Sequence, residues 1–490
     1  MTETLIVVSS YDPGYLRISE HLLRRALAAG QHPIVLDVSK ALASPPDTYH
    51  RGTLKLFGRT FPGHDLTKRF TSLGAEVIDI SSLAIDPSAV ALPREVEELL
   101  DSAIESALIT FYRTEVPNMR RRSVVGTRRR LDREGRTVWA AVHRMLDNHQ
   151  SIGEVVVPNG RFPNQKLATL AAHSRLIPTM HFEKGETPDG AYLQPYAPQS
   201  RILSQNHVGP TLKNLAHDEI VGVAEGWMSR RWPSKDSPNE FAALWDEDLP
   251  PGFIQIVADG ARIAGFFTSS QDEFQSLGPE WQLHSWNTQF EAFDAVMTIL
   301  EKQGFRCFLR VHPNLATKAQ DSYVNEREGI KWIAARHPDL LVIWHDQAAN
   351  SYRLLEQCAV AVVWDSTIGL EASARRIPVW TMATSRYGLT ADVRELLTPA
   401  AVTEKALVPW TVDPYGAQRF IAYLVLRDSQ MPVEFDAWET WDTGSSPFGV
   451  SIARVLVSGG NPTPRTAVTS LVDVYRHRGV RANLRSLLRR

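Results

Sequence analysis

The chain has 490 residues, of which 43% are hydrophobic and 22% charged, and its formal net charge at pH 7 is −2. This length excludes one ordinary hydrophobic core and predicts two or three domains, while the composition is typical of a soluble globular protein. A net charge so close to zero argues against a dedicated nucleic-acid binder, so we expect no nucleic-acid partner.

The first half of the chain alternates strand and helix patterns. Strands are expected at residues 5–9, 33–38, 75–80, 154–157 and 179–182. Strands that alternate with helices are typical of βαβ units, so we predict a parallel sheet in an α/β domain spanning residues 1–232. The next stretch, 233–251, is rich in Pro, Asp and Ser and is interpreted as a linker.

A second α/β series is predicted at residues 252–430. Its strands are expected at residues 262–267, 305–311, 340–344, 359–364 and 379–381. The last segment, 431–490, is expected to be a helical extension. Two consecutive α/β domains joined by a linker imply a cleft between them.

The stretch at residues 359–375 carries the strongest functional signal. A buried strand pattern leads directly into Asp365, Ser366 and Thr367, which are helix-capping residues, and then into a helix. Such a helix N-terminus binds phosphate, and in parallel sheets ligands bind at the carboxyl ends of the strands. We expect Ser366 and Thr367 to hold phosphate oxygens and Glu371 to accept hydrogen bonds from ribose hydroxyls. The alternative is an ordinary capped βαβ unit.

Other polar residues follow neighbouring strands of the second domain. His312 comes directly after the strand at 305–311 and could donate a hydrogen bond to a phosphate oxygen. Ser269 and Ser270 follow the strand at 262–267 and are further candidates for ligand binding. The alternatives are a loop histidine with a structural role and a polar turn.

The first domain contributes candidates of a different kind. Glu183 and Glu186 follow a strand, and a carboxylate there could act as a general base or as a nucleophile. Asn159 and Arg161 flank Gly160 after another strand, and Arg161 suits a carboxylate or phosphate. The alternatives are solvated loop charges and a simple turn.

Several motif classes are missing from the sequence. It contains no HExxH, paired CxxC, P-loop or GxGxxG fingerprint, so we expect no metal site, no resident cofactor and no dinucleotide fold. Cys307 and Cys358 lie in or beside apolar runs, which predicts buried thiols in a reducing compartment. No signal peptide is expected, and no stretch approaches the roughly 18 apolar residues of a membrane span, so the expected location is the cytoplasm.

Two segments are strongly basic. Arginines gather at residues 119–136, in the first predicted domain, and at 475–490. Anionic lipid attracts such residues, so weak peripheral contact with the inner membrane face is one interpretation. A solvated helix face is the other.

The motifs together resemble the bacterial capsule polysaccharide biosynthesis glycosyltransferases. The matching pieces are FFTSSQDEF (266–274), LRVHPN (309–314), SYRLLEQC (351–358), VVWDSTIGLEASARRIPVW (362–380), PNGRFPNQKLATLAA (158–172) and FEKG (182–185). Related families are the 3-deoxy-manno-octulosonate transferases, bacterial sialyltransferases and polyglycerol-phosphate transferases.

This resemblance implies a GT-B fold, in which two Rossmann-like domains with parallel sheets face each other across a cleft, and a metal-independent transfer from a nucleotide-sugar donor to a saccharide or lipid-linked acceptor. It implies that His312, Ser366 and Thr367 contact the donor phosphate and Glu371 the ribose. The related transferases often carry two serines where this chain has Ser366 and Thr367, which leaves CMP-, CDP- and UDP-linked donors open. Two alternatives remain: an alditol-phosphate transferase with a CDP-linked donor, and a non-catalytic nucleotide-sugar-binding subunit of a polysaccharide-synthesis complex.

Overall fold

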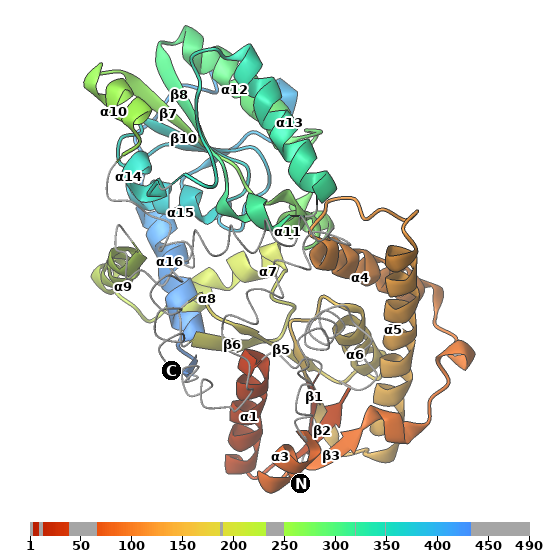
Figure 1. The fold of residues 1–490 in the computed structure, drawn as a ribbon. Helices are drawn as coiled ribbons and strands as arrows, with labels where there is room; N and C mark the ends of the chain where they lie inside the picture. The colour runs from red at the N-terminus through yellow and green to blue at the C-terminus, as the bar shows by residue number, and fades with distance from the viewer. Residues whose placement is uncertain are drawn as a thin grey trace, which may run out of the picture. The chain divides into compact units, whose positions relative to one another are not determined.

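The computed structural model describes residues 3–8, 13–38, 66–186, 190–231, 249–318, 320–347 and 349–432. These residues form two compact units (Figure 1). Of the described residues, the first unit contains those up to Tyr112, Val116–Ser200 and those from Leu426 onward. The second unit contains Arg113–Glu115 and Arg201–Val425.

The sheet of the first unit has seven strands in the order β13-β6-β5-β4-β1-β2-β3. Neighbouring strands from β5 to β3 pair in parallel, whereas β6 pairs antiparallel with both β5 and β13. The strands are β1 (Glu3–Val8), β2 (His32–Asp37), β3 (Glu76–Asp79), β4 (Ile152–Pro158), β5 (Thr179–Lys184), β6 (Gly190–Gln194) and β13 (Met431–Pro432).

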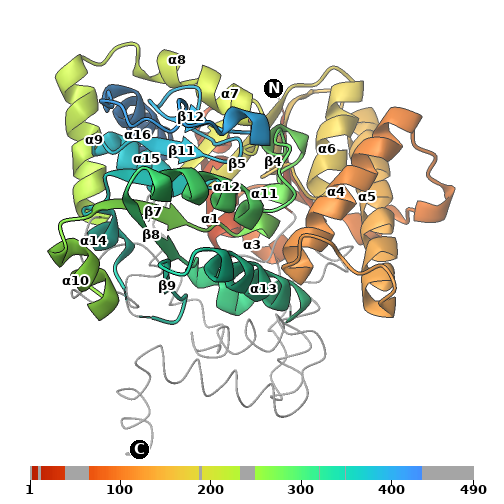
Figure 2. The same ribbon diagram turned by 90° about the horizontal axis from the view of Figure 1, so that it is seen from above.

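Helices cover both faces of this sheet, because alternate strand residues point to opposite sides. Leu5 and Val7 of β1 pack in one cluster, and Ile6 and Val8 in another. The helices are α1 (Pro13–Ala28), α3 (Leu66–Ser72), α4 (Arg94–Tyr112), α5 (Arg122–Asn148) and α6 (Pro163–Ser174). Of these, α4, α5 and α6 lie side by side (Figure 2).

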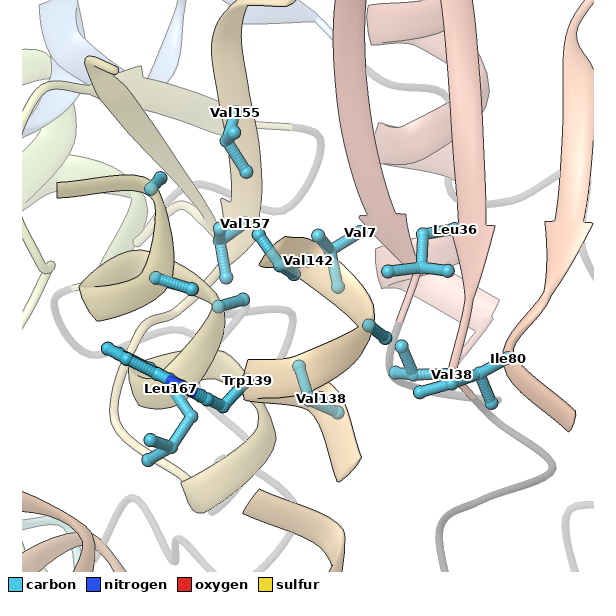
Figure 3. Close-up of a cluster of buried hydrophobic side chains, with 14 of the residues drawn as sticks. Val7, Leu36, Val38, Ile80, Val138, Trp139, Val142, Val155, Val157 and Leu167 are labelled. Carbon is cyan, nitrogen blue, oxygen red and sulfur yellow. The ribbon is translucent and has the colours of Figure 1, made fainter. Parts of the chain in front are cut away.

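The amphipathic helix α5 closes one of these two clusters. Val138 and Val142 are four residues apart and therefore share a helix face, and neither is exposed to solvent. In Figure 3 Val142 lies between Val7 of β1 and Val157 of β4. This packing fixes the central strands of the first unit, whose carboxyl ends carry candidate residues.

The sheet of the second unit has six strands, all parallel, in the order β12-β11-β10-β7-β8-β9. The strands are β7 (Arg262–Phe267), β8 (Phe305–Arg310), β9 (Leu341–Ile343), β10 (Val360–Val363), β11 (Val379–Thr381) and β12 (Arg394–Glu395). The helices are α7 (Arg201–Asn206), α8 (Val208–Leu212), α9 (His217–Arg231), α10 (Pro251–Ala258), α11 (Gln271–Gln275), α12 (Gln289–Lys302), α13 (Gln320–Arg336), α14 (Ser351–Leu355), α15 (Thr367–Ala374) and α16 (Tyr415–Asp428). The end of α16, from Leu426 onward, belongs to the first unit.

Both sheets contain a topological switch point. In the first unit the chain runs outward from β1 through β2 to β3, and then returns to the other side of β1 with β4. In the second unit it runs from β7 through β8 to β9, and returns beside β7 with β10. Ligands of open α/β sheets bind at the carboxyl ends of strands where the order reverses, so each unit has one such place.

The predicted α/β class is confirmed: the described chain forms two Rossmann-like units, each with a mainly parallel sheet. The GT-B arrangement of these units remains a prediction. One detail of the prediction is wrong, because the first sheet is not wholly parallel. Strands β6 and β13 join it antiparallel, and the sequence analysis expected neither. A cleft between the units remains a prediction.

The compact units divide at different residues from the expected domains. Helices α7 to α9, at residues 201–231, belong to the second unit, although the sequence placed them in the first. Arg201 and Arg231 explain the difference, because both make ion pairs to carboxylates of the second unit. Residues 431 and 432 form a strand of the first sheet. Two parts of the prediction lie outside the described residues. They are residues 233–248 of the expected linker and residues 433–490 of the expected extension, which include the basic segment 475–490.

Within the described residues, every helix is too short or too polar to span a membrane.

Candidate functional site

Polar side chains lie at or beside the switch point of each unit. We call Tyr15, Asn159, Glu183 and Gln199 the first-unit site, because hydrogen bonds join them near the ends of β4 and β5. We call His312, Asp365, Ser366 and Thr367 the second-unit site, because they follow β8 and β10. The two sites are described separately.

Glu183 is the centre of the first-unit site. It is half-buried near the end of β5. Its Oε1 accepts hydrogen bonds from the Tyr15 hydroxyl at 2.5 Å and from the Lys184 backbone N–H at 2.8 Å. Its Oε2 accepts one from the side-chain amide of Asn159. Three donors therefore orient both oxygens of this carboxylate.

The turn after β4 brings Asn159 to Glu183. Asn159 and Gly160 both have positive φ angles, 50° and 88°, and Asn and Gly adopt this region most readily. A Cβ on Gly160 would lie 2.6 Å from the His181 ring, so only glycine fits there. The Asn159 N–H donates to the Phe182 carbonyl at 2.9 Å, and Gln199 donates to the Asn159 side-chain oxygen.

The other two first-domain candidates have different surroundings. The Arg161 guanidinium lies 4.7 Å from the centre of the Phe162 ring, and its backbone N–H donates to Gln165 at 3.2 Å. The Glu186 backbone N–H donates to the Asp428 carboxylate at 2.5 Å. Sequence reasoning missed Tyr15 and Gln199. Their chemistry is common, and only the folded chain places them beside Glu183 and Asn159.

His312 begins the second-unit site as the cap of a short 3-10 helix, Pro313–Thr317. Its Nδ1 accepts a hydrogen bond from the Asn314 backbone N–H at 3.1 Å, so the ring proton of the neutral imidazole is on Nε2. Burial, together with the positive charges of Lys318, Arg113 and Arg310, lowers the pKa of His312 to about 4. At neutral pH His312 therefore offers a neutral N–H donor and carries no positive charge.

Buried ion pairs surround this histidine in the second unit. The Lys318 ammonium is 1% exposed and lies 2.8 Å from Glu326, 2.9 Å from Glu115 and 3.3 Å from Asp272. These carboxylates raise the pKa of Lys318 against the opposing effect of burial. Lys318 is thus neutralised by its own partners and is not a free cation for a ligand.

Ser366 caps helix α15, as predicted. Its hydroxyl accepts a hydrogen bond from the Ile368 N–H at 3.4 Å, and its carbonyl accepts one from the Tyr387 hydroxyl at 2.7 Å. Ser366 is half-buried and Thr367 is exposed. The first turn of α15 thus places the exposed Thr367 side chain at the carboxyl end of β10, while the N–H groups of Ile368 and Gly369 donate to the hydroxyl and the carbonyl of Ser366.

Ser269 and Ser270 lie deeper than these residues. They are 2% and 1% exposed, respectively. The Ser269 hydroxyl donates to the Asp365 carbonyl at 2.8 Å and ties the end of β7 to the end of β10. The Ser270 hydroxyl donates to Asp272 at 2.9 Å. Both hydroxyls thus make hydrogen bonds within the second unit. A donor-binding role for Ser269 and Ser270 remains a prediction.

Glu371 is also buried, at 2% exposure. Its Oε1 accepts hydrogen bonds from the Tyr352 hydroxyl at 3.0 Å and from Arg231 at 3.2 Å. The Arg231 guanidinium in turn stacks on the Trp227 ring at 4.5 Å. Sequence reasoning missed Tyr352 and Arg231. A ribose role for Glu371 remains a prediction and would require its carboxylate to be shared with these donors.

Asp365 was considered in the sequence only as a helix cap, but Ser366 makes that contact. Asp365 is 2% exposed, and its Oδ2 has no hydrogen-bond partner among the described residues. Burial raises the pKa of Asp365 to about 8, although the nearby Arg386 and Arg201 act in the opposite direction. At neutral pH this residue is therefore mainly a neutral carboxylic acid next to the N-terminus of α15.

Within the described part of the chain, no three His, Cys, Asp or Glu side chains are grouped as a metal site would require. The residues of both sites are hydrogen-bond donors and acceptors. The expectation of a metal-free site remains a prediction.

Comparison with known proteins identifies no family. No family model matches the sequence, and a search of curated proteins finds no match.

Solved structures share parts of the chain path. The KpsC beta Kdo 2,4 transferase of Thermosulfurimonas dismutans has 15% sequence identity and a TM-score of 0.35, over 56% of this chain and 80% of that one. The UDP-GlcNAc 2-epimerase of Neisseria meningitidis bound to UDP-GlcNAc has 10% identity and a TM-score of 0.30, over 86% and 98%. A glycosyltransferase from Rickettsia africae has 9% identity and a TM-score of 0.28, over 87% and 94%. Similarity this low assigns no function to this chain.

Proposed function

We propose that this chain is a GT-B glycosyltransferase that moves a sugar from a nucleotide-sugar donor to a surface-polysaccharide or glycoconjugate acceptor. The observation that carries the proposal is the second-unit site. A capped helix N-terminus with an exposed threonine and a neutral histidine N–H donor lie at the carboxyl ends of β10 and β8, and β10 flanks the switch point.

Donor binding would use neutral hydrogen-bond donors. The N-terminus of α15 and the Thr367 hydroxyl would hold one group of phosphate oxygens, and the helix dipole favours their negative charge. His312 Nε2–H would donate to another oxygen and stabilise charge that develops on the leaving nucleotide. In this proposal the hydrogen-bond donors of the protein stabilise the negative charge of the phosphate, so the transfer needs no metal ion.

The acceptor would be activated by Glu183. As the acceptor oxygen forms its bond to the sugar carbon, its O–H bond breaks and the proton moves to the Glu183 carboxylate. The bond between sugar carbon and phosphate oxygen breaks, and the nucleotide leaves with that electron pair. A carboxylate has about four acceptor sites, and Tyr15, Lys184 and Asn159 use three of them, so the acceptor hydroxyl would donate to the remaining one on Oε2.

A thermal-shift screen tests the donor class directly. CMP, CDP, UDP, GDP and their sugars are added separately, and a ligand that binds only the native state raises its unfolding temperature. We expect one nucleotide series to do so, and its sugar to be transferred to a saccharide or lipid-linked acceptor. No stabilisation by any of them would overturn the proposal.

The same screen separates the two alternatives. Stabilisation by CDP-linked alditols, followed by transfer of an alditol phosphate, would favour an alditol-phosphate transferase. Binding without turnover on any saccharide or lipid-linked acceptor would favour a non-catalytic subunit.

We also propose peripheral contact with an anionic membrane, where a lipid-linked acceptor would be found. Four exposed arginines lie at the start of α5: Arg120 and Arg121 just before it, Arg122 as its first residue, and Arg129 about two helical turns later. Each basic residue near an anionic surface contributes about 1 kcal/mol of attraction, which salt screens.

A further inference from the structure

Asp428, the last residue of α16, packs against the turn that follows Glu183 in the first unit. Asp428 is not exposed to solvent. Its Oδ2 accepts a hydrogen bond from the Glu186 backbone N–H at 2.5 Å. Its Oδ1 accepts two from Arg427, from Nε at 3.0 Å and Nη2 at 2.9 Å. The carboxylate thus joins the turn to the end of α16 through both oxygens.

Gly185 shows how closely the turn fits this carboxylate. A Cβ on Gly185 would lie 2.5 Å from Cγ of Asp428 and 2.6 Å from its Oδ2, distances that real side chains do not adopt. The Gly185 N–H donates to the Gly190 carbonyl at 2.6 Å and closes the hairpin between β5 and β6. Glycine is therefore required at position 185 because Asp428 occupies the space of a side chain.

Arg427 holds the neighbouring strand. Its guanidinium carbon lies 3.7 Å from the centre of the Tyr192 ring. Tyr192 is the partner of Glu183 in the antiparallel pairing of β5 with β6. Arg427 is 8% exposed and Asp428 is fully buried, so the pair forms a buried ion pair that contacts the Glu183 segment on two sides.

We propose that Asp428 is a positioning residue for Glu183. It holds the turn that begins with Gly185 and Glu186, directly after Lys184, the last residue of β5. The Lys184 N–H donates to Glu183 Oε1 at 2.8 Å. If the turn moves, the Lys184 N–H moves with it, and the Glu183 carboxylate loses one of the hydrogen bonds that fix its orientation. The catalytic part of this inference rests on the proposed role of Glu183 as the general base, whereas the effect on the turn does not.

The first test measures the turn without using activity. Asp428→Asn keeps the volume and one oxygen but removes the charge that pairs with Arg427. Trypsin cleaves after lysine, so loosening of the turn should increase the rate of cleavage at the Lys184–Gly185 bond, measured by mass spectrometry, by about tenfold. Asp101→Asn is the matched control, because it breaks an exposed ion pair of the same unit, to Arg128. Equal cleavage rates in Asp428→Asn and the wild type would overturn the proposal.

The second test connects the turn to catalysis. We expect Asp428→Asn to lower kcat about tenfold with unchanged KM for the nucleotide-sugar, because a small misplacement of a catalytic group lowers the rate more than it lowers binding. In a Glu183→Gln background the same change should cost nothing further, since Asp428 acts through Glu183. An equal loss in both backgrounds would overturn the positioning role.

Gly185→Ala covers the case in which Asp428→Asn does not fold. It pushes the turn away from Asp428 while leaving the ion pair in place, so it should give the same faster cleavage and the same fall in kcat. Wild-type cleavage in Gly185→Ala would contradict the proposal. Faster cleavage without activity in any variant or in the wild type would instead mean that the proposed function is wrong and the contact is real.

Discussion

The hydroxyl of Tyr15 donates a 2.5 Å hydrogen bond to Oε1 of Glu183, although the two residues are 168 positions apart in the chain. Tyr15 lies in the first helix, which follows β1, and Glu183 lies near the end of β5. Asn159, directly after β4, donates to the other oxygen, and the Lys184 N–H of β5 donates to Oε1, so donors from three segments orient one carboxylate.

The Tyr15→Phe variant tests this orientation. Phenylalanine keeps the ring and removes the hydroxyl, and a hydrogen bond to a charged group is worth about 1.5–3 kcal/mol. We expect kcat to fall about tenfold and nucleotide affinity to stay unchanged. Tyr112→Phe is the control, because it removes a hydroxyl that contacts Thr127 in the same unit. Equal rates in the two variants would exclude Tyr15 from the catalytic site.

Glu183→Gln removes the proposed base while keeping its volume. Turnover should fall by about two orders of magnitude or more, with little change in donor affinity. The NH₂ group of the new glutamine would face a hydrogen-bond donor such as the Asn159 amide. Two facing donors cannot form a hydrogen bond, which would lower the free energy of unfolding by about 1–3 kcal/mol. The unfolding temperature must therefore be measured as well. Glu186→Gln is the control. A larger loss of turnover at Glu186 would move the catalytic role there.

The double variant His312→Ala/Ser366→Ala tests the donor site. Losing the His312 contact, worth about 1.5–3 kcal/mol with a charged partner, and the Ser366 cap that orders the first turn of α15 should weaken nucleotide binding, measured by calorimetry, by tenfold or more. Ser366→Ala also removes the cap of α15, which costs about 1 kcal/mol of stability. Thr288→Ala controls for that loss, because Thr288 caps α12 of the same unit. Wild-type affinity in the double variant would contradict phosphate binding at this site.

Asp365 predicts a pH dependence of stability. Its pKa is about 8 in the folded chain and 3.8 in its ordinary environment, so between these values the unfolded state binds fewer protons than the folded state. The free energy of unfolding should therefore decrease as the pH rises from about 4 to about 8. Asparagine cannot ionise, so Asp365→Asn should lack this decrease.

The measurement is a pair of denaturation curves for each protein, at pH 5 and pH 8. The gain in stability of Asp365→Asn over the wild type should be larger at pH 8, by on the order of 2–4 kcal/mol, because one pKa unit corresponds to about 1.4 kcal/mol. A difference that does not change with pH would mean that Asp365 ionises normally in the fold.

Exposed arginines predict salt-reversible binding to anionic vesicles. Replacing Arg120, Arg121 and Arg122 with glutamine should reduce co-sedimentation at low salt, because each arginine contributes about 1 kcal/mol. The control replaces Arg94, Arg306 and Arg353, which changes the net charge equally at other exposed sites. Deletion of residues 476–490 should reduce binding as well. Equal recovery in the supernatant with and without anionic lipid would contradict a membrane role.

Local chemistry was readable from the sequence. Apolar runs followed by capping residues predicted the parallel strands and the turn in which Ser366 caps α15, and the structure shows both. Hydrophobic periodicity and capping act over a few residues, so a single chain displays them. The same local signals placed Asn159, Glu183 and His312 at strand ends.

The tertiary structure alone decided which residues meet there. Tyr15 reaches Glu183, Arg231 reaches Glu371 across 140 positions, and Asp428 reaches Glu186 across 242. Such contacts depend on the order of the strands and on which helix packs over which strand. Neither of these two features produces a periodic pattern of hydrophobic residues in the sequence. The pKa values of His312 and Asp365 depend on the same packing, because burial by distant segments causes the main shift in each. The sequence by itself therefore determined where the polar residues stand along the chain, and the fold decided their partners and their charge.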